Sequence, residues 1–219
     1  MSAATTASIR SSRVGTWMGI VFVTLFSVGF SVFSTPSDNK NTAKWQHWWS
    51  DSGHRAGAVA GAYLMVLGLI AFLWFLSSLR DRLEGGGLVV IFGSVFVALG
   101  LVSTLVRAAI PGGKVFGDTP IPSSPDLARQ FDNVGFALLL VAGALAAGGF
   151  VVATSYLARR SGLLPGWLTI AGFVVGVLQL AAGLFFPFLL LLIWVLVTCI
   201  VLLSRLRMAA RAPAATSGG

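Results

Sequence analysis

Long stretches without a charged residue constrain this chain more than any other feature of its sequence. Five such runs cover residues 14–37, 56–79, 85–106, 133–158 and 161–204. A helix needs about 20 apolar residues to cross the roughly 30 Å hydrocarbon core of a bilayer. The first four runs each accommodate one such helix, and the fifth is long enough for two. The sequence therefore predicts an all-α, polytopic membrane protein with a bundle of six transmembrane helices.

Composition agrees with this prediction, because 56% of the residues are hydrophobic and 10% are charged, against about 25% charged residues in an average globular domain. We expect a six-helix transmembrane domain over residues 14–204, with spans at 14–34, 56–79, 88–110, 133–157, 166–184 and 188–204. Residues 1–13 and the basic residues 205–219 are expected to be flexible cytoplasmic tails. A signal peptide is the alternative for Arg10–Ser34, but its apolar stretch exceeds the usual length of about 7–15 residues.

The net charge of +8 is explained by membrane topology, because Lys and Arg are retained on the cytoplasmic side. With both termini in the cytoplasm, the outer segments carry six basic and five acidic residues, a net charge of +1. The cytoplasmic segments reach +7 through Arg10, Arg13, Arg80, Arg82, Arg159, Arg160, Arg205, Arg207 and Arg211 against Asp81 and Glu84. We therefore expect a multi-pass protein of the bacterial plasma membrane. Its expected partners are membrane lipids and a protein in the membrane, and no nucleic acid.

The first outer loop contains three tryptophans whose spacing predicts a short helix. Trp45, Trp48 and Trp49 stand at positions i, i+3 and i+4, so they share one helical face, and Trp prefers the headgroup level of a bilayer. We expect them to be interfacial anchors on the outer side, with Trp167 as an anchor on the inner side. An irregular loop whose indoles touch lipid is the alternative.

The remaining loops carry recognisable helix signals. Proline at position 111 is expected to end the third span, and residues 111–122 should be the least regular segment. Ser124-Pro125-Asp126 reads as a helix start, with Ser as N-cap, Pro at the first position and Asp at the positive helix end. The turn between the last two spans should fall near residues 184–188, with Pro187 at the start of the last helix.

No Asp, Glu, Lys, Arg or His lies in the middle of any expected span. Ionisable groups at bilayer depth are costly and mark ion pathways and catalytic sites. Their absence argues against a proton relay, a metal site at the bilayer centre and haem held by histidine pairs. No cofactor is expected.

Two charged residues at the outer membrane boundary form the main candidate site. Arg107 lies at the outer end of the third span, and helical side chains lean toward the N-terminus, so its side chain points toward the bilayer. Asp132 lies at a comparable depth on the following helix. We expect an ion pair that clamps the two helices, and a ligand-binding site for an anionic headgroup or substrate is the alternative. Arg129 is a competing partner for Asp132.

Gln179 is the most deeply placed strongly polar side chain. In hydrocarbon an amide seeks a hydrogen bond to a neighbouring helix, and a contact with substrate is the alternative. The small-residue pairs Gly172/Gly176 and Gly143/Ala147 lie four residues apart inside spans, a spacing that allows helix backbones to approach closely.

The outer loops offer few residues for catalysis or metal binding. His47, Asp51 and His54 could form a weak surface metal site, but their spacing matches no standard zinc motif. Asp51-Ser52-Gly53-His54 contains the residue types of a catalytic triad, although sequence neighbours seldom adopt that geometry. The single Cys199 permits no intramolecular disulfide. We therefore assign no catalytic residue and no metal.

Three segments resemble a family of uncharacterised bacterial six-span integral membrane proteins, labelled DUF4386-like. They are residues 62–64 with 73–80 (AYL, LWFLSSLR), residues 132–137 (DNVGFA) and residues 161–168 (SGLLPGWL). The excess of Arg over Lys is similar to that of actinobacterial chains. The resemblance covers most of residues 14–204 and implies the same six-span fold, without an activity, a substrate or a catalytic residue.

Three functions remain open from the sequence. A non-enzymatic accessory, assembly or sensing bundle is favoured, because motifs and intramembrane charges are lacking. A small transporter or channel for an apolar or weakly polar solute would need a continuous polar cavity that includes Gln179 and the Arg107/Asp132 corner. A membrane enzyme with an outer-face site would need five outer residues to converge, namely His47, Asp51, His54, Asp126 and Asp132.

Overall fold

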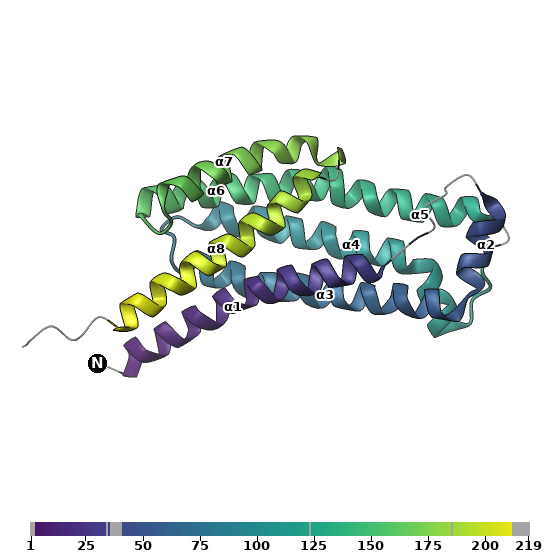
Figure 1. Ribbon diagram of the computed structural model, residues 1–219, viewed down its shortest axis with the longest axis horizontal. Helices are drawn as coiled ribbons and strands as arrows, with labels where there is room; N and C mark the ends of the chain where they lie inside the picture. Colours follow the sequence, from purple (N-terminus) through teal and green to yellow (C-terminus); the bar gives the residue numbers. More distant parts are fainter. Residues whose placement is uncertain (1–2, 34, 36–40, 123, 185, 212–219) are drawn as a thin grey trace, which may run out of the picture.

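The computed structural model describes residues 3–33, 35, 41–122, 124–184 and 186–211, and all of its regular elements over these residues are helices (Figure 1). In chain order they are α1 (Ala3–Val32), α2 (Thr42–Ser50), α3 (Ser52–Arg80), α4 (Gly87–Gly117), α5 (Pro125–Ala137), the π-helix η1 (Leu138–Gly143), α6 (Ala144–Ser161), α7 (Gly166–Leu178), the 3-10 helix η2 (Gln179–Leu184) and α8 (Phe186–Arg211). The expected all-α fold class is confirmed.

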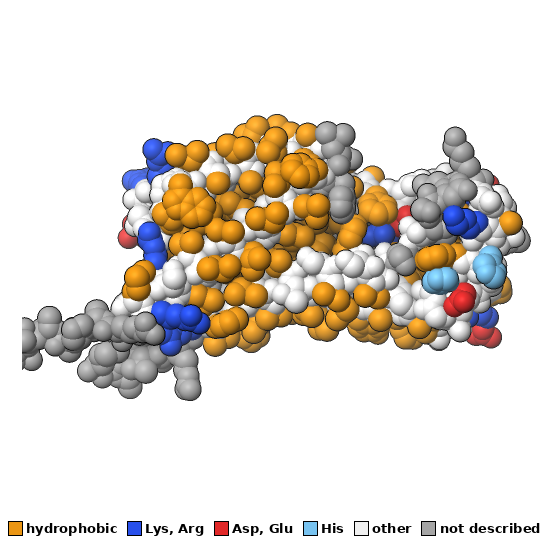
Figure 2. Space-filling view, in the orientation of Figure 1, with side chains coloured by type: hydrophobic (Ala, Val, Ile, Leu, Met, Phe, Trp, Pro, Cys, Tyr) orange, Lys and Arg blue, Asp and Glu red, His pale blue; other side chains and the backbone are white. Residues whose placement is uncertain are grey.

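Five helical segments are long and apolar enough to cross a membrane. They are Arg13–Val32, Ser52–Arg80, Gly87–Gly117, Asp126–Ser161 and Phe186–Met208, and Gly166–Ala181 forms a shorter apolar helix. Large apolar side chains such as Tyr63, Trp74 and Ile193 are more than half exposed on the outside of the bundle. In the space-filling view an apolar belt separates charged side chains at the two ends (Figure 2). This distribution fits a membrane-embedded helical bundle, because lipid tails solvate an apolar surface that water would not.

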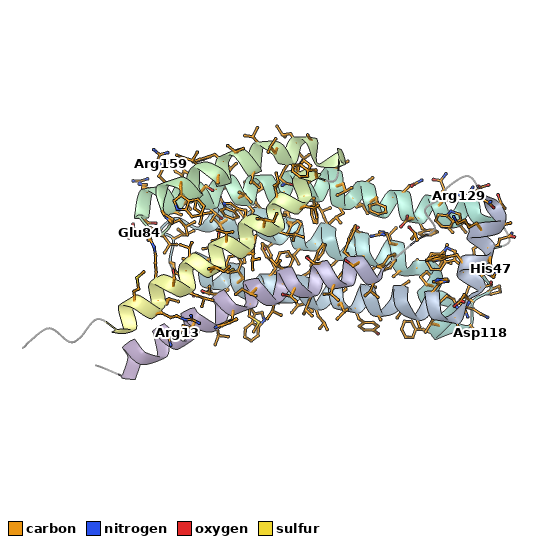
Figure 3. All side chains as sticks on the ribbon, viewed as in Figure 1. Arg13, His47, Glu84, Asp118, Arg129 and Arg159 are labelled. Atoms are coloured by element: carbon orange, nitrogen blue, oxygen red, sulfur yellow. The ribbon has the colours of Figure 1, made fainter. Side chains whose placement is uncertain are left out.

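The long helices lie side by side and run back and forth along one axis (Figure 1). Helix α2 crosses one end of the bundle, which we call the α2 end. Figure 3 shows His47, Asp118 and Arg129 at this end, and Arg13, Glu84 and Arg159 at the opposite end. Charged side chains that are far apart in the sequence are thus sorted to two poles.

Aromatic rings fill the centre of the bundle. Phe72 makes edge-to-face contacts with Phe96 and Phe150, at centroid separations of 5.5 and 5.2 Å. Gly176 packs on α6 so closely that a Cβ there would lie 2.5 Å from a side-chain carbon of Val152. The close approach expected at the Gly172/Gly176 pair is therefore confirmed, whereas a Cβ on Gly143 would meet the neighbouring helix only at an ordinary 3.9 Å.

Both expected tails are partly helical, which corrects the expectation of flexible segments. Helix α1 already begins at Ala3, and α8 continues to Arg211. No Gly or Pro interrupts residues 3–13 or 205–211, so an adjoining helix can extend through them. Residues 212–219 of the second tail lie outside the described residues.

Helix α4 also continues past its expected end. Pro111 lies inside the helix, which ends at Gly117. A proline within a helix removes the backbone hydrogen bond to the carbonyl four residues earlier, here that of Arg107. Asp118 closes the helix in the left-handed conformation, with its amide donating to the Gly113 carbonyl. The irregular segment that we expected over residues 111–122 is therefore shorter.

Other helix ends match their sequence signals. The Ser124 hydroxyl accepts from the Asp126 amide and caps α5, and Gly162 ends α6 with a φ of +66°. Pro187 lies in the first turn of α8, while Phe185 of the expected turn lies outside the described residues. Helix α5 continues through η1 into α6, as the expected fourth span requires. The π-helical geometry of η1 was not anticipated.

Candidate functional site

The ion pair between Arg107 and Asp132 is the centre of the candidate site. The Arg107 Nε donates to Asp132 Oδ1 at 2.8 Å, which joins α4 to α5. The two side chains are 3% and 14% exposed. The expected pairing is confirmed, and the competing Arg129 pairs with Asp126 instead, at 3.0 Å.

Phenylalanine rings surround the Arg107 guanidinium. Its central carbon lies 4.0 Å from the ring centroid of Phe136, 4.5 Å from Phe33 and 5.6 Å from Phe30. A guanidinium over an aromatic face is attracted by the negative potential of the ring. Arg107 is thus held from one side by a carboxylate and from others by three rings.

Helices α4 and α5 approach closely at this point because residue 135 is glycine. A Cβ there would lie 2.2 Å from the Arg107 Cγ and 3.0 Å from the Ser103 carbonyl oxygen. The Ser103 hydroxyl donates to the Gly135 carbonyl at 2.6 Å. The small residue allows the aliphatic part of Arg107 to cross α5, which places its charged group beyond that helix.

The guanidinium faces a cavity of about 510 Å³ between α1 and α8. Five phenylalanines line it, and Leu189 and Leu192 of α8 complete its apolar part. Ser27 and Ser31 of α1 add hydroxyls near Arg107. Figure 1 shows α1 and α8 diverging toward the α2 end, and residues of both helices line the cavity. The phenylalanines are Phe26, Phe30, Phe33, Phe136 and Phe188.

Helix α2 covers this end of the bundle, and its tryptophans contact protein. Trp45 and Trp49 are 1% and 4% exposed and pack with Phe33 of the Arg107 site. The helix predicted from the tryptophan spacing is confirmed, but the expected contact of these two indoles with lipid is corrected. The spacing of the tryptophans shows only that they share one face of α2, and in the structure α3 and α5 cover that face. Trp167, by contrast, is 60% exposed.

Gln179 lies apart from the Arg107 site. Its Nε2 donates to the Pro187 carbonyl at 2.7 Å, so it joins η2 to the start of α8. Gln179 also lines a separate groove of about 460 Å³ along α4, α6 and α7. No residue that the structure assigns to this groove also lines the Arg107 cavity.

Of the outer residues considered for catalysis or metal binding, Asp51 and His54 lie together, with 4.0 Å between Oδ1 and Nδ1, whereas Asp126 and Asp132 are in other pairs. The Asp51 carboxylate accepts from the amides of Gly53 and His54 and caps α3. His54 stacks on Trp48 with the ring centroids 3.6 Å apart. Asp126 and Asp132 pair with different arginines. Within the described part of the chain, no three His, Cys, Asp or Glu side chains form a group that could hold a metal ion.

Sequence reasoning found the charged pair but missed its aromatic surroundings and the cavity. Phe30 in the last turn of α1 and Phe33 directly after that helix stand three residues apart, and Phe136 stands four residues after Asp132. These spacings place each set on one helical face, a signal that could have suggested rings beside the pair. The π-helix η1, a geometry that often occurs at functional sites, begins two residues after Phe136.

No family model, curated protein or solved structure matches this chain. The site geometry is therefore the basis for assigning a function.

Proposed function

We propose that this protein is a non-enzymatic, multi-pass protein of the bacterial plasma membrane that binds or senses a lipid in the α1–α8 cavity. The lipid places an oxygen-bearing head on Arg107 and its chain against the phenylalanines. The observation that carries this proposal is a nearly buried arginine that faces an apolar cavity. Arginine is the residue best suited to hold phosphate and carboxylate oxygens.

The depth of Arg107 supports a position at the headgroup level. It lies twenty residues beyond Gly87, the first residue of α4, or about 30 Å at 1.5 Å per residue. That distance equals the approximate thickness of the hydrocarbon core. With the opposite end at the cytoplasmic surface, the guanidinium lies where the outer hydrocarbon boundary meets the headgroups.

Six spans with cytoplasmic termini complete the proposal. The remaining span is the apolar helix Gly166–Ala181, which rises about 24 Å before the kink at Ala181. Arg80 is the last residue of α3, and Arg159 and Arg160 lie in the last turn of α6; Figure 3 shows Arg159 at the end opposite α2. Basic residues at this end are what the positive-inside rule expects of a cytoplasmic surface. The α2 end is then extracytoplasmic.

Separate cavities favour binding over transport. A transporter would need a polar path that joins Arg107 to Gln179, and the two line different cavities. An outer-face enzyme is less favoured as well, because Asp51 caps α3 beside His54 whereas Asp126 and Asp132 pair with different arginines.

Lipid retention tests the proposed binding. We expect the purified chain to carry lipid in native mass spectrometry and Arg107→Gln to lose most of it. Arg129→Gln, which changes an arginine at the same end outside the cavity, is the matched control and should retain lipid. Ser31→Phe narrows the cavity mouth without touching the ion pair, so it keeps the test decisive if Arg107→Gln misfolds. Equal retention in Ser31→Phe and the wild type would contradict the proposal.

Cysteine labelling tests the topology. In a Cys199→Ala background, Thr119→Cys should react with an impermeant maleimide in intact cells. Ser161→Cys and Met208→Cys should react only after lysis, and all three positions are exposed in the structure. A five-span chain would place residue 208 outside, so labelling of Met208→Cys in intact cells would contradict six spans.

A further inference from the structure

The charge balance around Arg107 restricts which lipid the cavity can take. The guanidinium already faces the Asp132 carboxylate at 2.8 Å, so the pair has no net charge. Among the residues that the structure assigns to the cavity lining, Arg107 is the only charged one. A ligand with a net negative charge would leave that charge uncompensated in an apolar place, which is unfavourable.

The pair nevertheless keeps both hydrogen-bond donors and a hydrogen-bond acceptor for further partners. A guanidinium has five N–H donors, and within the described residues Asp132 is its hydrogen-bond partner, through Nε. The terminal N–H groups therefore remain for an acceptor in the cavity. Asp132 in turn uses Oδ1 for Arg107, and its Oδ2 makes no hydrogen bond to any described residue.

The order of groups along the cavity matches the orientation of a lipid in the outer leaflet. Asp132 lies one turn nearer to the α2 end of α5 than Phe136. Phe26 lies one turn nearer to the opposite end of α1 than Phe30. From the outer end inward, a ligand therefore meets a guanidinium and then apolar rings, while Asp132 lies behind the guanidinium, outside the cavity lining. This is the order of a phosphate and an acyl chain.

We infer that the α1–α8 cavity selects a phospholipid with a zwitterionic head, whose phosphate binds Arg107 and whose own ammonium balances the phosphate charge, because Asp132 already neutralises Arg107. This inference rests on the proposed lipid binding and names its ligand class.

Headgroup competition in nanodiscs tests the inference on the full chain. Phosphatidylethanolamine, phosphatidylcholine and phosphatidylglycerol with identical acyl chains are offered in equal amounts, and the lipid released with the protein is measured by native mass spectrometry. We expect phosphatidylethanolamine to exceed phosphatidylglycerol by about tenfold, the factor that about 1.4 kcal/mol produces. Phosphatidylcholine, whose head is also zwitterionic, should likewise exceed phosphatidylglycerol. Free phosphoethanolamine, which lacks acyl chains, should displace none of them, and displacement by it would overturn the assignment to a lipid.

A charge-changing variant sharpens the test. Asp132→Asn leaves Arg107 with an unbalanced positive charge, so the preference should reverse in favour of phosphatidylglycerol. Asp126→Asn removes a carboxylate at the same end, outside the cavity, and should keep the wild-type preference. If the wild type carries phosphatidylglycerol at least as well as phosphatidylethanolamine, the inference fails while lipid binding stands. If it carries no lipid, the proposed function itself fails. The wild-type comparison decides the outcome even if Asp132→Asn does not fold.

Discussion

The two ends of the bundle handle charged side chains differently. The ion pairs of Arg107, Lys114 and Arg129 with aspartates lie at the α2 end. At the opposite end, Arg205 donates to the carbonyls of Gly162 and Leu163, and Arg82 donates to the Thr16 hydroxyl. Arg205 therefore meets neutral carbonyl oxygens at that end.

This difference separates two tasks. An end rich in arginines suits the cytoplasmic surface, where positive charge orients a membrane protein. An end where acidic and basic side chains pair can bury polar groups and line a cavity. The α2 end is accordingly the end where substitutions should disturb packing and binding, whereas matched changes at the other end should be tolerated.

The largest difference in stability is expected between tryptophan substitutions at the two ends of the bundle. Trp45→Ala removes a ring that is 1% exposed and packs on Phe33, so we expect a loss of about 3–5 kcal/mol in the free energy of unfolding. Trp167→Ala at the opposite end removes a mostly exposed ring and should change stability by about 0.5 kcal/mol or less. Thermal unfolding in one detergent measures both. A larger shift for Trp167→Ala would reverse the comparison.

Breaking the ion pair at the cavity should have the next largest effect on stability. Arg107→Gln leaves Asp132 without its partner, and breaking a buried pair costs about 3–5 kcal/mol, which the partial exposure of Asp132 lowers. Asp132→Asn should act similarly, and the double variant should recover part of the loss. Asp126→Asn breaks a pair whose acid is mostly exposed and should cost about 1 kcal/mol or less. Strictly additive losses in the double variant would show that the pair does not act as a unit.

A smaller effect is expected where α4 crosses α5. Gly135→Ala places a methyl group against the Arg107 side chain and the Ser103 carbonyl, an overpacking that costs about 1–3 kcal/mol. Gly112→Ala on α4 meets its nearest neighbour at an ordinary 3.9 Å and should be neutral or slightly stabilising. Melting temperatures of the two alanine variants compare them directly, and equal values would argue against the close approach.

The smallest effect concerns the cap of α3 at the α2 end. The pKa of Asp51 lies below its ordinary value of 3.8, because the amides of His54 and Gly53 donate hydrogen bonds to the carboxylate. The ionised form is favoured in the folded state, so its stabilisation is complete above pH 3.8 and is lost as the pH falls through the lowered pKa.

Hydrogen exchange of the Gly53 and His54 amides, corrected for intrinsic rates, checks this expectation. Protection should decrease at acidic pH in the wild type. Asp51→Asn keeps a capping oxygen that does not titrate, so its protection should stay constant over the same range. An identical pH dependence in both proteins would argue against the cap.

Charge-free runs sufficed to predict the helices of the core, because hydrocarbon leaves the backbone few alternatives. They could not locate every helix end, and α4 passes Pro111 because the proline removes only one hydrogen bond. The pairing of Arg107 with Asp132 followed from matched depths on consecutive helices. The cavity could not be predicted, because it depends on the divergence of α1 and α8, helices from opposite ends of the chain. The tryptophan spacing likewise defined a face without showing what covers it.

The π-helix η1 has a consequence for the register of the longest helical segment. A π turn contains one more residue than an α turn. Each residue of an α-helix corresponds to a rotation of about 100° about the helix axis, so the extra residue changes which face of the helix the following residues occupy. Asp132 and Gly135 precede it and face α4, whereas Phe150 and Val151 follow it and are completely buried in the core. Deletion of one residue within 138–143 would turn one of these faces away from the bundle. The insertion allows a single helix to serve the polar site in its first half and the apolar core in its second.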